Sequence, residues 1–350
     1  MKRFLTSSLL LASASVSFGQ VSIAPDRGVD VYETPDGQVV AADVTGTYVF
    51  NTWSDYHSSE FFEVNNMRCI ARDVPGAVLP ESVADCSNSN TNPSNTYAPS
   101  GETYVIPVVF HIFIANNGNG NIADQRVIEQ VQILNDDFAS LTNSNIQFVL
   151  APGGINRYTS NSWYNDKGNY TSVRWDTTQY LNIYSNTAGG SLGYAYLPSG
   201  GGVAGTDFDG VRLFWRTVGY TNYSPYNLGR TGTHEVGHYL GLYHTFQGGC
   251  GSSNCYGSGD LICDTNPEGG PNYSACQPSQ AISCGSQDPV RNYMDYSEDA
   301  CMDNFTQEQA RRMRCTLMNF RPTLSDGGGG GGGGGAVSRV ARGWHVASRS

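Results

Sequence analysis

The stretch TGTHEVGHYLGLYH, residues 231–244, constrains this chain more than any other part of its sequence. It holds His234, His238 and His244, half of the 6 histidines in 350 residues. Histidines four positions apart on a helix project from one face about one turn from each other, so both imidazoles can reach one metal ion. Gly241 lacks a Cβ and can take the left-handed conformation that ends a helix. That turn can bring His244 back to the same ion.

Three neutral imidazoles with an open fourth position are typical of a catalytic zinc rather than a structural one. Glu235 lies about 100° around the helix from His234, so it is placed to accept a proton from a water on the metal rather than to bind the metal. The pattern therefore predicts one catalytic Zn²⁺ and a general base. The rival interpretation is a set of ordinary core or surface histidines, but this pattern arises by chance in on the order of one chain in a hundred thousand.

The N-terminus and the cysteines indicate export. Residues 1–19 have the basic start, apolar middle and small-residue end of a signal peptide. No other stretch approaches the roughly 20 apolar residues of a membrane helix, so we expect a secreted protein without a membrane span. The 9 cysteines predict disulfides and one thiol with another task. The net charge of −11 argues against nucleic acid as a partner, and no feature indicates an oligomeric state.

The order of elements predicts one α/β domain at 102–322, preceded by a pro-segment and polar linker at 20–101 and followed by a flexible glycine-rich tail at 323–350. Apolar runs predict strands, and helical periodicity predicts an amphipathic helix. The expected strands are 103–114, 145–151, 179–185, 192–198 and 209–216, and the helices are 124–141, one over the histidine stretch, and 306–320 with a capping box at Gln309. Residues 248–304 are cysteine-rich and irregular.

Two motifs in this order resemble the metzincin metallopeptidases. The first is the histidine pattern, and the second is RNYMDYS at 291–297, which supplies a methionine turn about fifty residues downstream. Together with GSGDLICDT (257–265) and NYMDYSEDAC (292–301), they make the chain similar to the pappalysin family. The resemblance implies a twisted mixed sheet with an active-site helix. It also implies an irregular, disulfide-rich C-terminal subdomain that ends in a helix.

The resemblance further implies a zinc-dependent endopeptidase that acts on proteins or peptides. Glu235 would be the general base, Met294 the hydrophobic floor of the site, and Tyr296 the donor that stabilises the oxyanion. The substrate would lie antiparallel to an edge strand at 191–198. Ala300 stands where some relatives have an acid, so the sequence does not support a strict preference for arginine or lysine.

Calcium and disulfides are implied by the same resemblance. The side chain of Asp260, Thr265, and the main-chain oxygens of Gly259 and Cys263 would bind Ca²⁺, for which oxygen ligands are suited. An ordinary Asx-rich turn is the rival interpretation. Cys276 would pair with Cys301, Cys284 would pair with Cys250 or Cys255, and Cys263 would find a local partner.

Cys69, which follows Arg68, is a candidate for the odd cysteine. In the family, an Arg-Cys pair in the pro-segment places its thiolate on the open position of zinc and keeps the enzyme latent. A Cys69–Cys86 disulfide is the rival. Because no lysine or arginine occurs between Arg72 and Arg126, a protease that cuts at basic residues must act at Arg72 or earlier. The alternative is autolytic maturation within the polar linker.

Two other functions remain open from the residues. Gly189 to Gly193 fit the G-x-S-x-G pattern of a serine hydrolase with Ser191 as nucleophile, although that pattern needs a helix directly after the serine. The zinc could also stabilise a secreted binding module that is not an enzyme. Glu235 and the open fourth position argue against this, since a structural site recruits a fourth Cys or His.

Overall fold

The computed structural model describes residues 28–69, 72–73, 86, 97–99, 101–140, 142–198, 203, 206–256 and 258–325. The predicted signal peptide, most of the predicted linker and the glycine-rich stretch lie outside these residues. Within the described part of the chain, no helix is long and apolar enough to cross a membrane.

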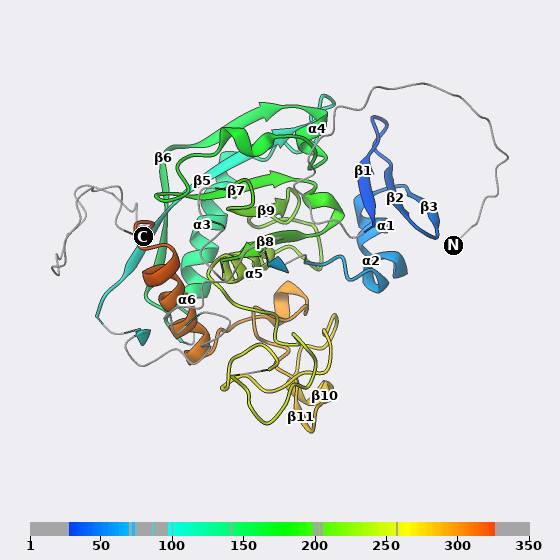
Figure 1. Cartoon of the computed structure of the whole chain (residues 1–350). Coiled ribbons are helices and arrows are strands. Elements are labelled where there is room, and N and C mark those ends of the chain that lie inside the picture. Colours follow the sequence, from blue (N-terminus) through cyan, green and yellow to red (C-terminus); the bar gives the residue numbers. More distant parts are fainter. Residues whose placement is uncertain are drawn as a thin grey trace.

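A six-stranded mixed sheet forms the centre of the molecule, in the order β4-β8-β9-β7-β5-β6 (Figure 1). Strands β5, β6, β7 and β9 are parallel, β8 runs antiparallel to β9, and β4 is parallel to β8. The twisted mixed sheet is as expected. Its strands are β4 (Arg72–Asp73), β5 (Tyr104–Ile114), β6 (Ile146–Thr159), β7 (Leu181–Asn186), β8 (Gly193–Leu197) and β9 (Val211–Phe214).

Two helices, α3 (Asp124–Phe138) and α5 (Arg230–Tyr239), pack against each other; α3 contacts β6 and α5 contacts β8 and β9. The apolar stripe of α3 meets the sheet in the main core. The helix ends at Phe138, before the predicted Leu141, and the Ser140 hydroxyl bonds the Asp137 carbonyl at its end. Strand β6 runs beyond the predicted end at 151, because a register shift against Val108 and Phe110 accommodates Gly153 and Gly154.

The C-terminal subdomain is irregular and held by disulfides, as expected. Cys276 pairs with Cys301, Cys250 with Cys284, and Cys255 with Cys263, so the local partner predicted for Cys263 is Cys255. Its regular pieces are a small hairpin of β10 (Ile282–Ser283) and β11 (Ser286–Gln287) and the 3-10 turns Pro278–Gln280 and Asp299–Cys301. The last helix, α6 (Gln307–Phe320), begins with the predicted capping box between Thr306 and Gln309.

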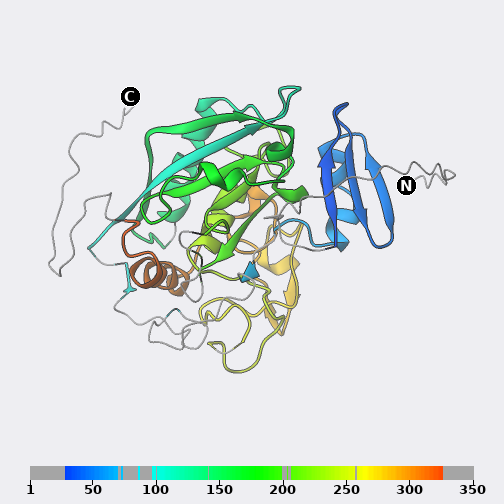
Figure 2. The ribbon, with the colours of Figure 1, turned by 45° about the horizontal axis from the view of Figure 1, so that its top comes forward.

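Residues 28–69 form an N-terminal module beside the main sheet (Figure 2). It contains β1 (Asp30–Glu33), β2 (Val39–Asp43), β3 (Gly46–Phe50), α1 (Trp53–His57) and α2 (Glu60–Val64). Its aromatic residues share a hydrophobic cluster with Tyr194 and Phe214 of the main sheet. The buried Glu33 carboxylate accepts hydrogen bonds at 2.6 Å from both Trp53 and Tyr164 of the short helix α4 (Asn161–Tyr164). The module is therefore docked by apolar packing and by a buried acceptor.

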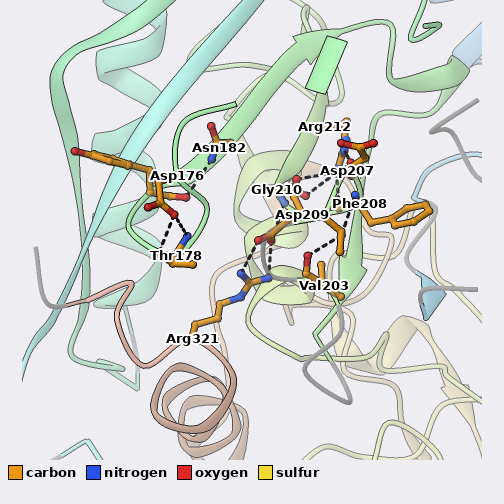
Figure 3. Close-up of polar contacts among 12 residues, drawn as sticks. Asp176, Thr178, Asn182, Val203, Asp207, Phe208, Asp209, Gly210, Arg212 and Arg321 are labelled. Carbon is orange, nitrogen blue, oxygen red and sulfur yellow. Dashed lines mark hydrogen bonds and ion pairs between the residues drawn. The ribbon is translucent and has the colours of Figure 1, made fainter. Parts of the chain in front are cut away.

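A buried ion pair joins the end of α6 to the loop before β9. Arg321, which follows α6, donates to both carboxylate oxygens of Asp209 just before β9, at 2.9 and 3.3 Å (Figure 3). Arg212 of β9 donates to the carbonyls of Asp207 and Phe208 in the same loop. Because Arg321 and Asp209 are both buried, their ion pair anchors the end of α6 to the sheet.

Candidate metal centre

Helix α5 carries the first two histidines of the motif in its buried part. The rings of His234 and His238 have centroids 4.7 Å apart. After the helix, Gly241 takes a left-handed φ of 93°. A Cβ there would also stand 2.5 Å from the Thr316 hydroxyl oxygen, so both the backbone angle and the available space require glycine. The turn brings the ring centroid of His244 to 4.4 Å from that of His238, as predicted from the spacing.

The three imidazoles converge through their Nε2 atoms. Nε2 of His238 lies 3.1 Å from that of His234 and 3.0 Å from that of His244. The Nδ1 atoms of His234 and His238 lie 2.6 and 2.7 Å from the carbonyl oxygens of Tyr293 and Leu242. Because a carbonyl only accepts hydrogen bonds, each of these Nδ1 atoms carries the proton and each Nε2 presents a lone pair. Facing lone pairs repel unless a cation lies between them, so this donor set fits a metal ion.

Burial favours the neutral form of the His234 and His238 rings. It lowers the pKa of His238 to about 4, and it lowers the pKa of His234 well below its ordinary value, with the neighbouring His238 and Arg68 adding to the effect. Neutral imidazole is the form that binds a metal. The protonation state therefore agrees with the geometry.

A fourth donor comes from the N-terminal module. The Sγ atom of Cys69 and the donor nitrogens of the three histidines all lie within 4.8 Å of one another, and all four residues are buried. The Cys69 thiol donates to Oε2 of Glu235 at 3.3 Å. Cys69 takes part in none of the four disulfides. The rival Cys69–Cys86 disulfide is wrong, because Cys86 pairs with Cys315.

Glu235 is fully buried beside this cluster. Its Oε1 atom has no hydrogen-bond partner among the described residues. Burial raises the pKa of Glu235 to about 8, opposed by the hydrogen bond from Cys69 and by the charge of Arg68. A Cβ at Gly193 would stand 2.7 Å from Cγ of Glu235, so the first residue of β8 passes directly beside this side chain. No sequence pattern had pointed to Gly193 as a neighbour of Glu235.

The methionine turn lies against the helix. A Cβ at Gly237 would stand 2.5 Å from Sδ of Met294, and the Met294 carbonyl accepts from the Thr245 amide next to the last histidine. The ring centroid of Tyr296 lies 4.9 Å from that of His244. Its hydroxyl donates to the main-chain carbonyl of Cys69 at 3.0 Å. Residues as distant in the chain as Cys69 and Tyr296, which are 227 positions apart, thus form one site.

Known metalloproteases are similar in sequence to this chain. The family model Peptidase_M43, described as pregnancy-associated plasma protein-A, matches residues 163–318. An extracellular metalloprotease of Verticillium alfalfae is 39% identical over 232 residues, which cover 63% of this chain and 78% of that protein. The chain belongs to the M43, or pappalysin, family of metallopeptidases. An extracellular metalloprotease of Pyricularia oryzae is 36% identical over 255 residues, or 70% of this chain and 84% of that protein.

Solved pappalysins have the same fold. A mutant of Tannerella forsythia promirolysin is 30% identical with a TM-score of 0.55, covering 66% of this chain and 88% of that one. Mature mirolysin in complex with a cleaved peptide is 34% identical with a TM-score of 0.54, covering 64% of this chain and 96% of that one. From its family and these neighbours, the chain described here is a metalloendopeptidase with a catalytic metal. The alternative of a binding module without catalytic activity is therefore not supported.

The serine hydrolase alternative has no support in this pappalysin. Ser191 is buried, and its hydroxyl donates to the Ala188 carbonyl at 2.6 Å. Strand β8 follows it, whereas the G-x-S-x-G turn of a hydrolase requires a helix at that point.

The predicted calcium loop brings two oxygens together. The Thr265 hydroxyl donates to Oδ2 of Asp260 at 2.8 Å, a spacing that two ligands of one Ca²⁺ can have. Oδ1 of Asp260 accepts from the Ile262 amide. Burial raises the pKa of the Asp260 carboxyl to about 7, so an adjacent cation would favour its ionised form. Asp264 points elsewhere and accepts from the Glu308 amide at the start of α6.

An acidic cluster below the site was missed by sequence reasoning. The buried Glu268 carboxylate accepts from the Thr245 hydroxyl and from the Asn272 amide group, both at 2.6 Å. The Asn272 main-chain N–H donates to Asp295. Burial raises the pKa of Glu268 to about 8, and the charges of Asp295 and Asp288 add to this. These acids come from irregular chain, where no periodicity shows which side chains meet.

Asp137 of α3 was also missed. Its buried carboxylate accepts from the Thr233 hydroxyl, from the Tyr293 hydroxyl at 3.1 Å, and pairs with Arg230 at 2.8 Å. Thr233 precedes the first histidine, and Tyr293 supplies the carbonyl that fixes the tautomer of His234. A carboxylate three residues after Leu134 lies on the apolar face of the predicted helix, and that position was the available signal.

Proposed function

We propose that this protein is a secreted, zinc-dependent endopeptidase made in a latent form. The observation that carries the proposal is the convergence of the His234, His238 and His244 Nε2 atoms beside the buried carboxylate of Glu235. Three neutral nitrogens suit zinc and leave a fourth position for a catalytic function. Such a zinc supplies Lewis acidity and makes water a nucleophile near neutral pH.

Glu235 and Tyr296 have the proton-transfer and hydrogen-bonding roles. Glu235 accepts the proton of the attacking water and delivers it to the departing amine. Its unpartnered Oε1 atom supports this role, because a buried oxygen without a donor is available to a water. Tyr296 donates to the oxyanion of the scissile carbonyl. Its present hydrogen bond to the main-chain carbonyl of Cys69 supports the proposal, since a peptide carbonyl is the same acceptor.

The peptide substrate lies along β8, antiparallel to it, by strand addition. In the structure, the edge of β8 that does not pair with β9 is paired with the pro-segment. Arg72 and Asp73 pair in parallel with Tyr196 and Leu197. Cys69 forms a parallel bridge with Gly193. A substrate and the pro-segment therefore compete for the same row of main-chain groups.

Cys69 would keep the enzyme latent by supplying the fourth ligand to the metal. Its Sγ atom and the three histidine nitrogens lie within 4.8 Å of one another, so one metal ion could bind all four. Arg68 helps to hold it, because the guanidinium carbon lies 4.6 Å above the Tyr226 ring centroid and 5.8 Å above that of Tyr296. The glycine that usually follows this cysteine in the family is replaced by Ile70 here, which weakens the resemblance. The position of Cys69 beside the three histidines supports the role despite that change.

Calcium and secretion complete the proposal. Asp260 and Thr265 would hold a Ca²⁺ together with main-chain oxygens of Gly259 and Cys263. At the zinc site, Met294 would serve as a packing residue beneath the metal. Secretion is supported by the predicted signal peptide, the four disulfides, and relatives that are named extracellular metalloproteases.

The test is Glu235→Gln in a Cys69→Ala background, so that latency does not mask the result. We expect the variant to keep zinc and to hydrolyse casein at least about 100-fold more slowly, because the base is lost and the ligands are not. Glu102→Gln, an exposed carboxylate in the same domain, is the matched control. Casein hydrolysis at the control rate, or full activity in the presence of a zinc chelator, would overturn the proposal.

A further inference from the structure

The Cys86–Cys315 disulfide connects the predicted pro-segment and linker, residues 20–101, to the catalytic domain. Cys86 lies 17 residues after Cys69, and Cys315 lies in α6 of the catalytic domain. Both cysteines are buried, and Tyr97 and Phe320 pack around them. The disulfide is therefore part of the folded body.

The catalytic domain holds its end of this connection firmly. Neighbouring residues of α6, Met313 and Leu317, belong to the main core, and Arg314 donates to the carbonyls of Glu102 and Ser144. Cys315 therefore moves with the sheet and the metal centre, and whatever is covalently joined to Cys86 stays close to the site.

We propose that this disulfide fixes where the maturation cut must lie. A cut C-terminal to Cys86, in the polar tract 87–101, leaves the module 28–69 joined to the catalytic domain through Cys86, and the enzyme stays latent. A cut between Cys69 and Cys86 releases the module, and the mature enzyme keeps Cys86 and its disulfide. The inference rests on the proposed latency by Cys69. Each cut is a hydrolysis that consumes one water and leaves a new carboxylate and a new amine.

The physical reason is effective concentration. Cys69 lies 17 positions before Cys86, and a chain of that length spans at most about 60 Å, so a tethered module remains at about a millimolar effective concentration. The module also docks through a shared apolar cluster: a Cβ at Gly190 would stand 2.5 Å from Cβ of Val31, and Trp53 packs 5.0 Å from Phe214 between ring centroids. At that concentration an interface of this kind stays closed, whereas a released module is lost on dilution.

The sequence adds a constraint on the protease. Arg72 is the one basic residue between Cys69 and Cys86, and no lysine or arginine occurs from there to Arg126. For a protease that cuts after basic residues, Arg72 is therefore the one site between Cys69 and Cys86, where a cut releases the module, and there is no site in the tract 87–101 that would leave a tethered product.

The experiment places one recognition sequence for a site-specific protease at two positions in the full chain. One variant carries it after Asp73, and the other carries it after Ser89. Both are cut with the same protease and compared by casein hydrolysis and by gels run with and without reductant. We expect the first to gain activity and lose the module. We expect the second to run as one band without reductant and to remain at least about tenfold less active, independent of dilution.

Full activity of the second variant while its disulfide is intact would overturn the inference. Retention of the module on the non-reducing gel by the first variant would overturn it as well. A Cys86→Ser, Cys315→Ser version of the second variant should gain activity on cutting, and the first comparison does not depend on whether this version folds. Failure of the latency proposal is distinguishable: uncut Cys69→Ala would then be no more active than the uncut parent.

Discussion

Replacing Asp137 by asparagine tests whether α3 positions the metal site. Asp137 is 2% exposed and its carboxylate serves the Thr233 and Tyr293 hydroxyls and the Arg230 guanidinium. Asparagine has one acceptor oxygen in place of two and no charge, so Arg230, which is largely buried, loses its ionic partner. A charge-assisted hydrogen bond contributes about 1.5–3 kcal/mol, and breaking a buried pair costs about 3–5 kcal/mol. We expect Asp137→Asn to lower the free energy of unfolding by about 3 kcal/mol.

Asp137→Asn should also lower the affinity of the site for zinc. Tyr293 accepts from Nδ1 of His234, and loss of a partner that supports a ligand lowers metal affinity about 10- to 100-fold. Unfolding would be measured by urea denaturation, and zinc affinity by competition with a chromogenic chelator. Asp136→Asn is the matched control, because Asp136 is the next residue on the same helix and is exposed. Its effect should stay within about 0.5 kcal/mol. If the two variants behave alike, or if Asp137→Asn unfolds more easily yet binds zinc normally, the positioning argument is wrong.

Three further changes probe the surroundings of the site. Gly237→Ala should lower the free energy of unfolding by about 1–2 kcal/mol, because overpacking against Met294 exceeds the gain in helix propensity. Urea denaturation should show a smaller loss in a Met294→Ala background. Added calcium should raise the wild-type Tm, and Asp260→Asn should remove that increment; a wild-type Tm that ignores calcium would argue against the site. The pKa of folded Glu268 is raised to about 8, so its contribution to stability is fully present below its ordinary pKa of 4.5 and is lost as pH rises towards 8. In chelator, Glu268→Gln should therefore show a smaller loss of stability between pH 5 and 8 by denaturation, and an equal loss would contradict this pKa shift.

The sequence alone determined the chemistry of the site and most of the elements. Spacing within one helix fixes the relative position of His234 and His238, and Gly241 is required by the backbone angle itself, so local geometry was enough. The capping box at Thr306 is equally local and was confirmed. The resemblance implied Cys276–Cys301 and paired Cys284 with Cys250 or Cys255, since spacing cannot choose among possible pairings, and the structure decided for Cys250.

Only the tertiary structure decided which distant residues meet. Asp137 bonds Tyr293, which is 156 positions away, and Cys86 pairs with Cys315, which is 229 positions away. The charges of Glu268 and Asp295 interact in irregular chain, where no hydrophobic periodicity shows which side chains meet. A sequence pattern reports contacts within one helix or strand, because those follow from backbone geometry. Contacts between elements depend on how their apolar faces pack, and that packing is a property of the whole chain. For this reason the residues that should bind the metal could be read from fourteen letters, whereas the disulfide that retains the pro-segment could not.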